Sequence, residues 1–157
     1  VERGKVRTYL RRWLPIGIGM LLAAAMIVMA AAVADYAPAA PLSGKRPKND
    51  ERWTVELEPT ADVLARLGAA RRPGQVLVGF AADGAGEGLE RARAKRVAKR
   101  ADLIVYNDVS RTDIGFDTDE NEVVVVSDTH ELRVEKAPKR EVAAAVLDEV
   151  ERLLSTR

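Results

Sequence analysis

The sequence predicts a three-layer α/β fold in which a mixed, mostly parallel β-sheet lies between two layers of helices. Three segments of apolar and β-branched residues, at 25–32, 75–82 and 103–106, have the composition of strands buried on both faces. Helical patterns at 87–100 and 138–155 alternate with them along the chain. Because such alternation is typical of α/β domains, we expect these three strands to be neighbours at the centre of one sheet.

The composition excludes several kinds of chemistry. The chain has 157 residues, enough for one domain with a substantial core, and it contains no cysteine and a single histidine, His130. Disulfides, cysteine nucleophiles, Ser-His-Asp triads and multi-histidine metal sites are therefore not expected. A net charge of +1 gives no overall basic surface, so we expect no nucleic-acid partner. Chemistry must depend on carboxylates, lysines and backbone amides, with or without a bound divalent ion.

The N-terminal part of the chain is open to two interpretations. The 21 residues of segment 14–34 carry no charge and follow two arginines, which is the pattern of a single membrane span. Alanine dominates this run, however, and Pro15, Gly17 and Gly19 interrupt it. The alternative is a helix or loop followed by the buried strand at 25–32. The sequence begins with Val1, so we expect a fragment or a mis-started reading frame.

The segment after the first strand reads as a loop, a strand and a short helix. Residues 37–50 are rich in proline, glycine and basic side chains, which predicts an exposed, mobile loop. Residues 53–57 alternate between apolar and polar side chains, which predicts a strand. Thr60 is a suitable N-cap for a helix that Gly68 would end. The side chains expected on its inner face are Val63, Leu64 and Leu67.

The second half of the chain predicts two longer helices and a hairpin. Segments 123–126 and 132–134 alternate as paired strands, after a polar loop at 107–121. Pro138 suits the first position of the closing helix. The expected inner face of the helix at 87–100 is Ala94, Val97, Ala98 and Ala101. That of the closing helix is Ala143, Val146, Leu147, Val150 and Leu154.

Five charged side chains are candidates for ligand binding. Asp35 directly follows the first apolar strand, and Lys45 lies ten residues later in the predicted loop. On residue type alone, Asp35 could equally cap a turn and Lys45 could be an ordinary exposed lysine. Lys95 and Lys99 are four residues apart, so they share one helix face, and Arg91 extends the stripe. Three like charges in a row destabilise a helix unless a polyphosphate or another anion neutralises them.

Two further segments match known ligand-binding motifs only in part. Gly84, Gly86 and Gly88 suggest a dinucleotide-binding turn, but the third glycine comes one residue early. Asp117-x-Asp119-x-Asn121 suggests a calcium loop, but Glu122 occupies the position that requires glycine. We expect neither site.

Four segments in this order resemble phosphopantothenate–cysteine ligase, which in many bacteria is the C-terminal half of a bifunctional flavoprotein decarboxylase/ligase. The segments are Met29–Tyr36 followed by Lys45, Val76–Ala82, Lys95–Lys99 and Asp102–Ser110. The resemblance covers residues 27–155. It implies a Rossmann-like sandwich truncated at its N-terminal side, with a divergent basic and apolar segment at 1–24 and the C-terminal part of the nucleotide-binding ligase domain at 25–157.

The resemblance implies a CTP site. Lys45 matches the first lysine of the family's K-x-K-K loop and would be catalytic, although Pro47 replaces the third residue of that motif. Ala61 replaces a proline at a helix start, and Asp83-Gly84 replaces Glu-Thr. We expect the lysines to converge with the Asp35 and Phe80 positions at the carboxyl ends of the strands, although a lone aromatic such as Phe80 could also be core. The implied nucleotide contacts are Met29, Ala30, Ala31, Asp35, Lys45, Ala61, Asp62, Val63, Leu64, Phe80, Lys95 and Lys99.

The implied reaction is the ligation of 4'-phosphopantothenate with cysteine through an acyl-cytidylate, as a step of coenzyme A synthesis. CTP would be the co-substrate with Mg²⁺, and FMN would be involved only through a fused or partner decarboxylase domain. The resemblance also implies a cytoplasmic homodimer. Because nothing here matches the family's acyl-intermediate asparagine, we expect CTP binding without ligation by this chain alone. The alternative is a membrane-anchored or degenerate, non-catalytic nucleotide-binding module.

Overall fold

The computed structural model describes residues 25–84, 86–111, 113–115 and 118–157. These residues divide into two compact units. One unit is the segment Ala31–Val63, called the arm below, and the other contains the described residues up to Ala30 and from Leu64 onward. The predicted segment 1–24 lies outside the described residues.

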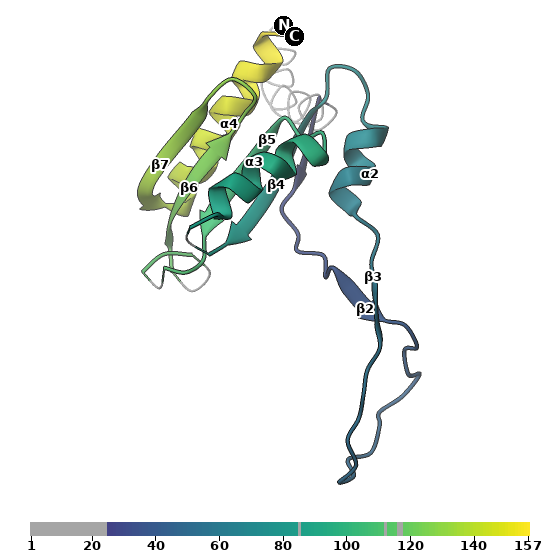
Figure 1. Cartoon of the computed structure of the whole chain (residues 1–157). Helices are drawn as coiled ribbons and strands as arrows, with labels where there is room; N and C mark the ends of the chain where they lie inside the picture. The colour runs from purple at the N-terminus through teal and green to yellow at the C-terminus, as the bar shows by residue number, and fades with distance from the viewer. Residues whose placement is uncertain (1–24, 85, 112, 116–117) are drawn as a thin grey trace, which may run out of the picture. The chain divides into compact units, whose positions relative to one another are not determined.

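The larger unit contains a five-stranded mixed sheet with the strand order β1-β4-β5-β6-β7 (Figure 1). Strands β1, β4 and β5 are parallel, whereas β6 pairs antiparallel with β5 and forms a hairpin with β7. The strands are β1 (Met26–Met29), β4 (Val76–Asp83), β5 (Leu103–Asp108), β6 (Glu120–Val126) and β7 (Glu131–Pro138). The predicted α/β class is therefore confirmed, and the three predicted strands are parallel neighbours. The prediction is wrong for the first of them, because β1 is shorter than 25–32 and lies partly buried at the edge of the sheet rather than at its centre.

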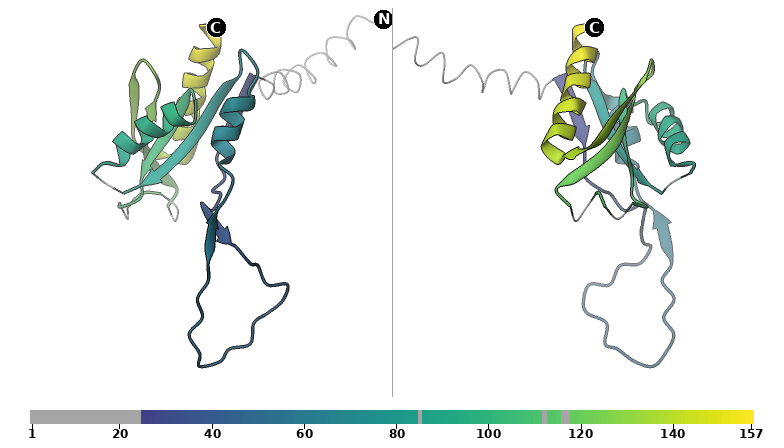
Figure 2. Two further views of the ribbon diagram at one scale, coloured as in Figure 1. Left: turned by 45° about the vertical axis from the view of Figure 1, so that its right-hand side comes forward. Right: turned by 90° about the vertical axis from the view of Figure 1, so that its left-hand side faces the viewer.

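Helices cover both faces of this sheet (Figure 2). Helices α2 (Val63–Ala70) and α3 (Gly88–Ala98) lie on one face, and α4 (Lys139–Ser155) lies on the other. The core under α2 and α3 includes Leu64, Leu77, Ala92, Ile104 and Tyr106. The core under α4 includes Val78, Val105, Val125, Val146 and Val150. Because successive side chains of a strand point to opposite faces, β4 and β5 supply both cores, which explains their continuous apolar sequences.

The inner face of α3 differs from the prediction. Ala94, Val97 and Ala98 are not among its buried residues, and Val97 keeps 67% of its surface accessible. The buried residues of the helix are Gly88 and Ala92. Gly88 is required there, because a Cβ atom at this position would lie 2.5 Å from the Tyr106 hydroxyl. Close packing of small residues, rather than the alanine-rich stripe, therefore sets the rotation of α3.

Two further predictions for the helices need correction. In α4, Ala143 is exposed and Leu147 is 49% exposed, whereas the buried positions are Val142, Val146, Glu149 and Val150. Pro138 is the residue before the helix rather than its first residue. The polar Glu149 on this inner face could not be inferred from hydrophobic periodicity, because its burial depends on partners from other elements.

Helix α2 also differs from the prediction at both ends. The Thr60 hydroxyl donates to the carbonyl oxygen of Ala34 instead of capping the helix. Gly68 lies inside α2 and is buried, so it does not end the helix. A methyl group at Gly68 would overlap the carbonyl oxygen of Lys99. Glycine at this position therefore permits the close approach of α2 to the end of α3.

The arm contains a short antiparallel ribbon formed by β2 (Tyr36–Pro38) and β3 (Leu57–Pro59). The predicted strand at 53–57 is wrong except for its last residue, because the pairing with β2 begins only at Leu57. Residues 39–56 form the loop that was predicted over 37–50, and it is longer than expected. Arg46 stacks over the Trp53 ring at 4.6 Å from its centroid. Large apolar side chains of the arm are exposed, including Tyr36, Leu42, Trp53 and Leu57.

The apolar run at 14–34 is not a single helix. Its residues Met26–Met29 form β1, which pairs with β4 in the sheet. Residues 14–24 lie outside the described part of the chain. Among the described residues, no helix has the length and hydropathy needed to cross a membrane.

Candidate functional site

The exposed end of β4 carries an aromatic side chain and a lysine from a neighbouring helix. The first four residues of β4 are buried, whereas Phe80 is 39% exposed. The Lys95 ammonium, from α3, donates a hydrogen bond of 2.8 Å to the Phe80 carbonyl oxygen. Within the described ranges, no carboxylate pairs with Lys95. A half-buried cation that is held only by a carbonyl oxygen can attract an anionic ligand.

Two more of the predicted contacts lie around the same part of β4. Met29 is the register partner of Gly79 in the β1–β4 pair. Leu64 packs over Gly79 from α2, because its Cδ2 atom lies 2.6 Å from the position that a Cβ atom of Gly79 would occupy. Met29, Leu64, Phe80 and Lys95 are thus gathered at the Gly79–Phe80 segment of one unit. Their contact with a nucleotide stays a prediction.

Lys99 lies one helical turn beyond Lys95, where α3 ends. It serves as the C-cap, and its backbone N–H donates to the carbonyl oxygen of Lys95, while the next N–H, that of Arg100, donates to the carbonyl oxygen of Val97. Its own carbonyl oxygen faces Gly68 of α2. Since α3 runs antiparallel to the parallel strands, Lys99 lies nearer than Lys95 to the ends where these strands begin (Figure 1).

The remaining predicted contacts belong to the arm, except for Ala30, which follows β1 in the larger unit. In the arm, the Asp35 carbonyl oxygen accepts a hydrogen bond of 2.9 Å from the backbone N–H of Thr60. Lys45 is exposed, next to the Arg46 that stacks on Trp53. The predicted convergence of the arm residues with Lys95 and Phe80 stays a prediction. The residues concerned are Ala31, Asp35, Lys45, Ala61, Asp62 and Val63.

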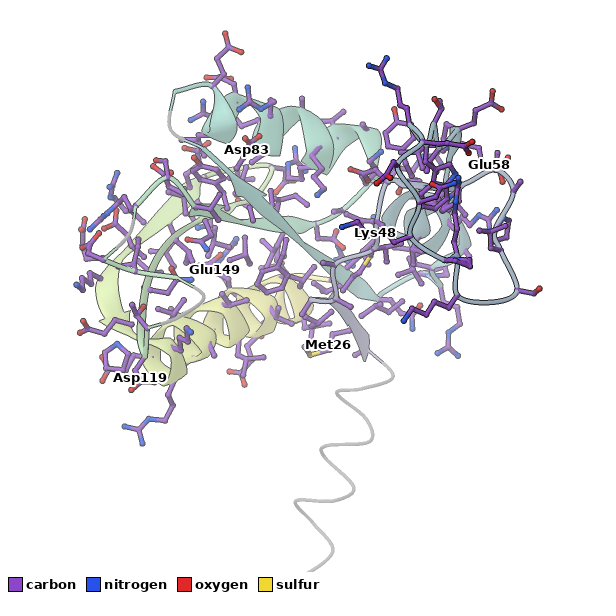
Figure 3. The ribbon with its side chains drawn as sticks, turned by 90° about the horizontal axis from the view of Figure 1, so that it is seen from below. Met26, Lys48, Glu58, Asp83, Asp119 and Glu149 are labelled. Carbon is purple, nitrogen blue, oxygen red and sulfur yellow. The ribbon has the colours of Figure 1, made fainter. Side chains whose placement is uncertain are left out.

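An ion pair that the sequence did not reveal closes the turn after β4. The Asp83 carboxylate accepts a hydrogen bond of 2.5 Å from Nε of Arg91 and one of 2.8 Å from the Gly84 N–H. These two bonds hold the pKa of Asp83 below its ordinary value, and the bond from Arg91 has the larger effect. Figure 3 shows Asp83 at the end of β4, beside α3. Arg91 is therefore not an unpaired third charge of the lysine stripe, and no pattern in the sequence indicated its pairing with Asp83.

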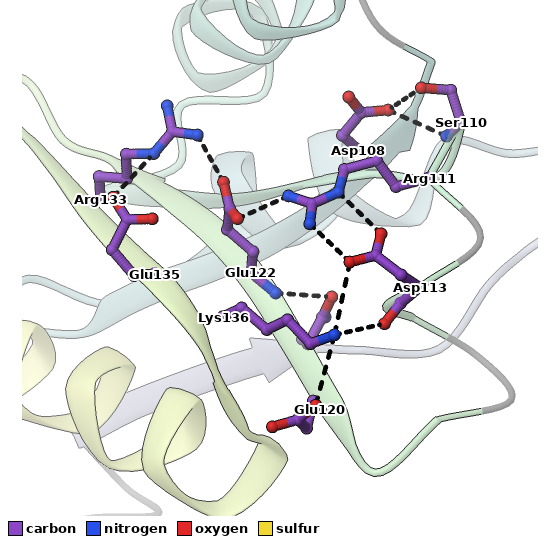
Figure 4. Close-up of polar contacts among 10 residues, drawn as sticks. Asp108, Ser110, Arg111, Asp113, Glu120, Glu122, Arg133, Glu135 and Lys136 are labelled. Carbon is purple, nitrogen blue, oxygen red and sulfur yellow. Dashed lines mark hydrogen bonds and ion pairs between the residues drawn. The ribbon is translucent and has the colours of Figure 1, made fainter.

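The polar loop after β5 is a network of internally matched charges (Figure 4). Glu122 accepts hydrogen bonds from Arg111, at 2.6 Å, and from Arg133. Arg111 also binds Asp113, and this bond lowers the pKa of Asp113 to about 2. At the start of the loop, Asp108 accepts hydrogen bonds from the N–H and the hydroxyl of Ser110. These contacts match the charges of the loop with one another and with those of the β6–β7 hairpin.

A separate pocket of about 340 Å³ lies between α3 and the β6–β7 turn, lined among others by Arg93, Arg96 and His130. His130 Nε2 lies 3.2 Å from the buried Glu149, and Ser127 lies 3.2 Å from Nδ1. This Ser-His-Glu set is not a catalytic triad, since the Ser127 hydroxyl donates to the His130 carbonyl oxygen and is buried in the turn. Arg93 forms two hydrogen bonds to Glu131, so its charge is matched within the fold.

The carboxylates do not form a metal cage in the described part of the chain. No group of three or more histidine, cysteine, aspartate or glutamate side chains there could hold a metal ion. A magnesium ion that accompanies a nucleotide usually binds phosphate oxygens and one or two carboxylates. Such an ion is compatible with this arrangement, whereas a permanent metal centre formed by these residues is not.

The chain matches one protein family over most of its length. The family described as DNA/pantothenate metabolism flavoprotein C-terminal domain matches residues 19–154. The coenzyme A biosynthesis bifunctional protein CoaBC of Bacillus subtilis (strain 168) is 38% identical over 127 residues, which are 80% of this chain and 30% of that protein. The CoaBC of Mycobacterium tuberculosis (strain ATCC 25618 / H37Rv) is 38% identical over 135 residues, 80% of this chain and 32% of that protein.

Solved structures agree with this match. The C-terminal domain of a CoaBC protein superposes with a TM-score of 0.61 at 29% identity, and the match covers 84% of this chain and 56% of that one. A Cab2 mutant in complex with phosphopantothenate-cysteine has a TM-score of 0.61 at 18% identity, covers 83% of this chain and 46% of that one, and supports the fold alone. The chain spans about a third of the length of the curated relatives that it matches. It belongs to the family of DNA/pantothenate metabolism flavoprotein C-terminal domains.

Proposed function

We propose that this chain is the CTP-binding part of a phosphopantothenate–cysteine ligase in coenzyme A biosynthesis. In the proposed reaction, the phosphopantothenate carboxylate attacks the α-phosphate of CTP and pyrophosphate leaves. The cysteine amine then displaces CMP from the acyl-cytidylate. The proposal is supported by membership of the family and by the resemblance of the individual site residues.

One observation carries the assignment of a triphosphate to this site. Lys95 is half-buried on α3, and its ammonium has no carboxylate partner among the described residues. Placing a lysine at a half-buried position costs stability unless an anion can use it. Lys95 would therefore bind phosphate oxygens, and the exposed Phe80 would lie beside the base. Lys99, one turn further along α3, would add to the positive charge that attracts the triphosphate.

The arm residues receive their roles from the resemblance alone. Lys45 would screen charge that develops as pyrophosphate leaves, which suits a lysine in an exposed loop. Asp35 would contact the nucleotide, and the short side chains of Ala30 and Ala31 would permit close approach of the ribose or base to the backbone.

Magnesium and flavin have different places in this proposal. Mg²⁺ would enter with the triphosphate, since the described carboxylates form no cage for it. Bound in that way, it would neutralise part of the phosphate charge. We assign no flavin contacts to this chain, because FMN would belong to a decarboxylase domain.

The other substrates and partners are also proposals. We propose that phosphopantothenate and cysteine need parts of such ligases outside the matched segment, which is 30% of the Bacillus subtilis relative. We also propose a homodimer, and the exposed apolar side chains of the arm, such as Tyr36 and Trp53, are candidates for its interface. Light scattering on the purified chain tests this, and a monomer at all concentrations would contradict it.

Calorimetry and a ligation assay test the central proposal. We expect weak binding of CTP in the presence of Mg²⁺, weaker binding of ATP, and no formation of phosphopantothenoylcysteine by this chain alone. Pyrophosphate release should likewise be absent. A folded sample that binds no CTP would contradict the proposal and support a degenerate, non-catalytic module. Full turnover by this chain would show that no further part of the ligase is needed.

A further inference from the structure

We propose that Arg91 is an additional phosphate-binding residue of this site and that Asp83 restrains it by holding its guanidinium in the nucleotide-free protein. The inference rests on the proposed function, since it takes the triphosphate as the ligand. Asp83 would therefore lower the affinity of the site for polyphosphates, which is the opposite of the effect expected for an ordinary structural ion pair.

The first step is the position of Arg91 relative to Lys95. The two residues are four positions apart in α3, so they are neighbours on the helix surface. Their contacts on β4 are also close in sequence: Lys95 binds the carbonyl oxygen of Phe80, and Arg91 binds the carboxylate of Asp83. The two cations thus lie in succession along the carboxyl-terminal half of one strand.

The second step concerns which partner of the pair is able to move. The backbone of Asp83 is fixed by its register pairing with Asp108 and by the Val109 N–H on its carbonyl oxygen, and the Gly84 N–H holds its carboxylate. The Arg91 side chain is 52% exposed. Its guanidinium also contacts Glu87 at 3.4 Å, which is long for a hydrogen bond. The guanidinium can therefore leave while the carboxylate stays.

The third step compares the two possible partners of Arg91. Exposed carboxylate–arginine pairs contribute little to stability, because water competes for both groups. A phosphate offers arginine a planar, bidentate contact with more charge. Asp83 nevertheless stays ionised at neutral pH, since the bond from Arg91 and then that from the Gly84 N–H lower its pKa. A triphosphate bound at Lys95 therefore has to compete with a fully charged Asp83 for Arg91.

A double-mutant cycle tests the inference by calorimetry with CTP and Mg²⁺, and separately with inorganic tripolyphosphate, which lacks a base and a ribose. We expect Asp83→Asn to increase the affinity about twofold to fivefold, the scale of one released surface ion pair. The increase should be lost in the double variant D83N/R91Q, and the salt dependence should be steeper in D83N than in wild type. Glu90→Gln removes a charge from the same helix but leaves Arg91 unchanged, and it should have little effect.

Each result separates a specific role from a general one. Unchanged or weaker binding by D83N, or an increase that persists in D83N/R91Q, would overturn the inference, because the second result would reflect only the loss of a negative charge. If the variants change tripolyphosphate affinity as expected but CTP does not bind, the site is a polyphosphate site. The inference then stands and the proposed function fails. If CTP binds but Asp83 and Arg91 are not coupled, the proposed function stands and this inference fails. Circular dichroism of each variant confirms folding.

Discussion

The two ends of the β4–β5 strand pair differ in how their charged side chains are paired. Where the strands begin, the Asp102 carboxylate is 11% exposed and accepts hydrogen bonds from Arg71, from Arg157 and, at 2.7 Å, from the Leu77 N–H. Where the strands end, the Lys95 ammonium meets only a carbonyl oxygen within the described region, beside the exposed Phe80. The first end matches its buried carboxylate with cations, whereas the second leaves a cation available.

This difference separates residues that stabilise the fold from residues that are available to a ligand. A partly buried carboxylate with three donors holds together the segments that supply these donors. Here they are Arg71, directly after α2, Leu77 of β4 and Arg157. A half-buried lysine without a carboxylate partner has no such benefit unless a ligand binds it. In open α/β sheets, ligands bind at the carboxyl ends of the strands, the end at which Asp83 is paired with Arg91 but Lys95 has no carboxylate partner among the described residues.

The largest effect is expected from removing the carboxylate at the matched end. Asp102→Ala leaves Arg71 and Arg157 without their shared partner and removes the acceptor for the Leu77 N–H. We expect a loss of about 3 kcal/mol in the free energy of unfolding, measured by urea denaturation. Nucleotide affinity of the folded fraction should not change. A loss below about 1 kcal/mol would show that these contacts are solvated surface pairs.

The helix contact at the same end should also be sensitive to added volume. Gly68→Ala places a methyl group against the carbonyl oxygen of Lys99, so α2 and α3 must separate. We expect a destabilisation of about 2 kcal/mol in thermal or urea unfolding. Gly44→Ala is the control, because no atom lies within 4 Å of its new Cβ. Equal effects of the two substitutions would contradict the close approach of the helices.

At the unmatched end, the main effect should be on binding rather than on stability. Lys95→Gln should weaken CTP binding about tenfold, the scale of a hydrogen bond to a charged group, and leave the free energy of unfolding nearly unchanged. The affinity of wild type should fall more steeply with salt than that of the variant. Lys139→Gln, at the start of α4, is the matched control. A Lys95→Gln variant that binds normally but unfolds readily would assign the lysine to the fold.

The smallest effect concerns pH and the charge network after β5. Burial opposes ionisation of Glu122, but hydrogen bonds from Arg111 and Arg133 outweigh it, so its folded-state pKa lies below the ordinary value of 4.5. The resulting stabilisation is fully present above pH 4.5 and is lost as the pH falls through the folded-state pKa. Glu122→Gln should therefore flatten the decline in unfolding free energy below this pH. An unchanged slope would show that other carboxylates determine the acid sensitivity.

The sequence alone was sufficient for the fold class and for the central strands. Continuous β-branched runs such as 75–82 are predictable because a strand covered by helices on both faces must be apolar at every position. The four-residue spacing of Lys95 and Lys99 likewise places them on one helix face by periodicity alone. Hydrophobic patterning and helical periodicity are local properties, so a single chain segment contains them.

Only the tertiary structure decided which way α3 faces and which charges are matched. The stripe of Ala94, Val97 and Ala98 was a misleading guide, because alanine gains little from burial and the fit of Gly88 and Ala92 against the sheet controls the rotation. The pairing of Asp83 with Arg91 and the matching of Asp102 by Arg157 depend on residues brought together across the fold. The distance between two charges sets their interaction, and sequence separation does not determine that distance.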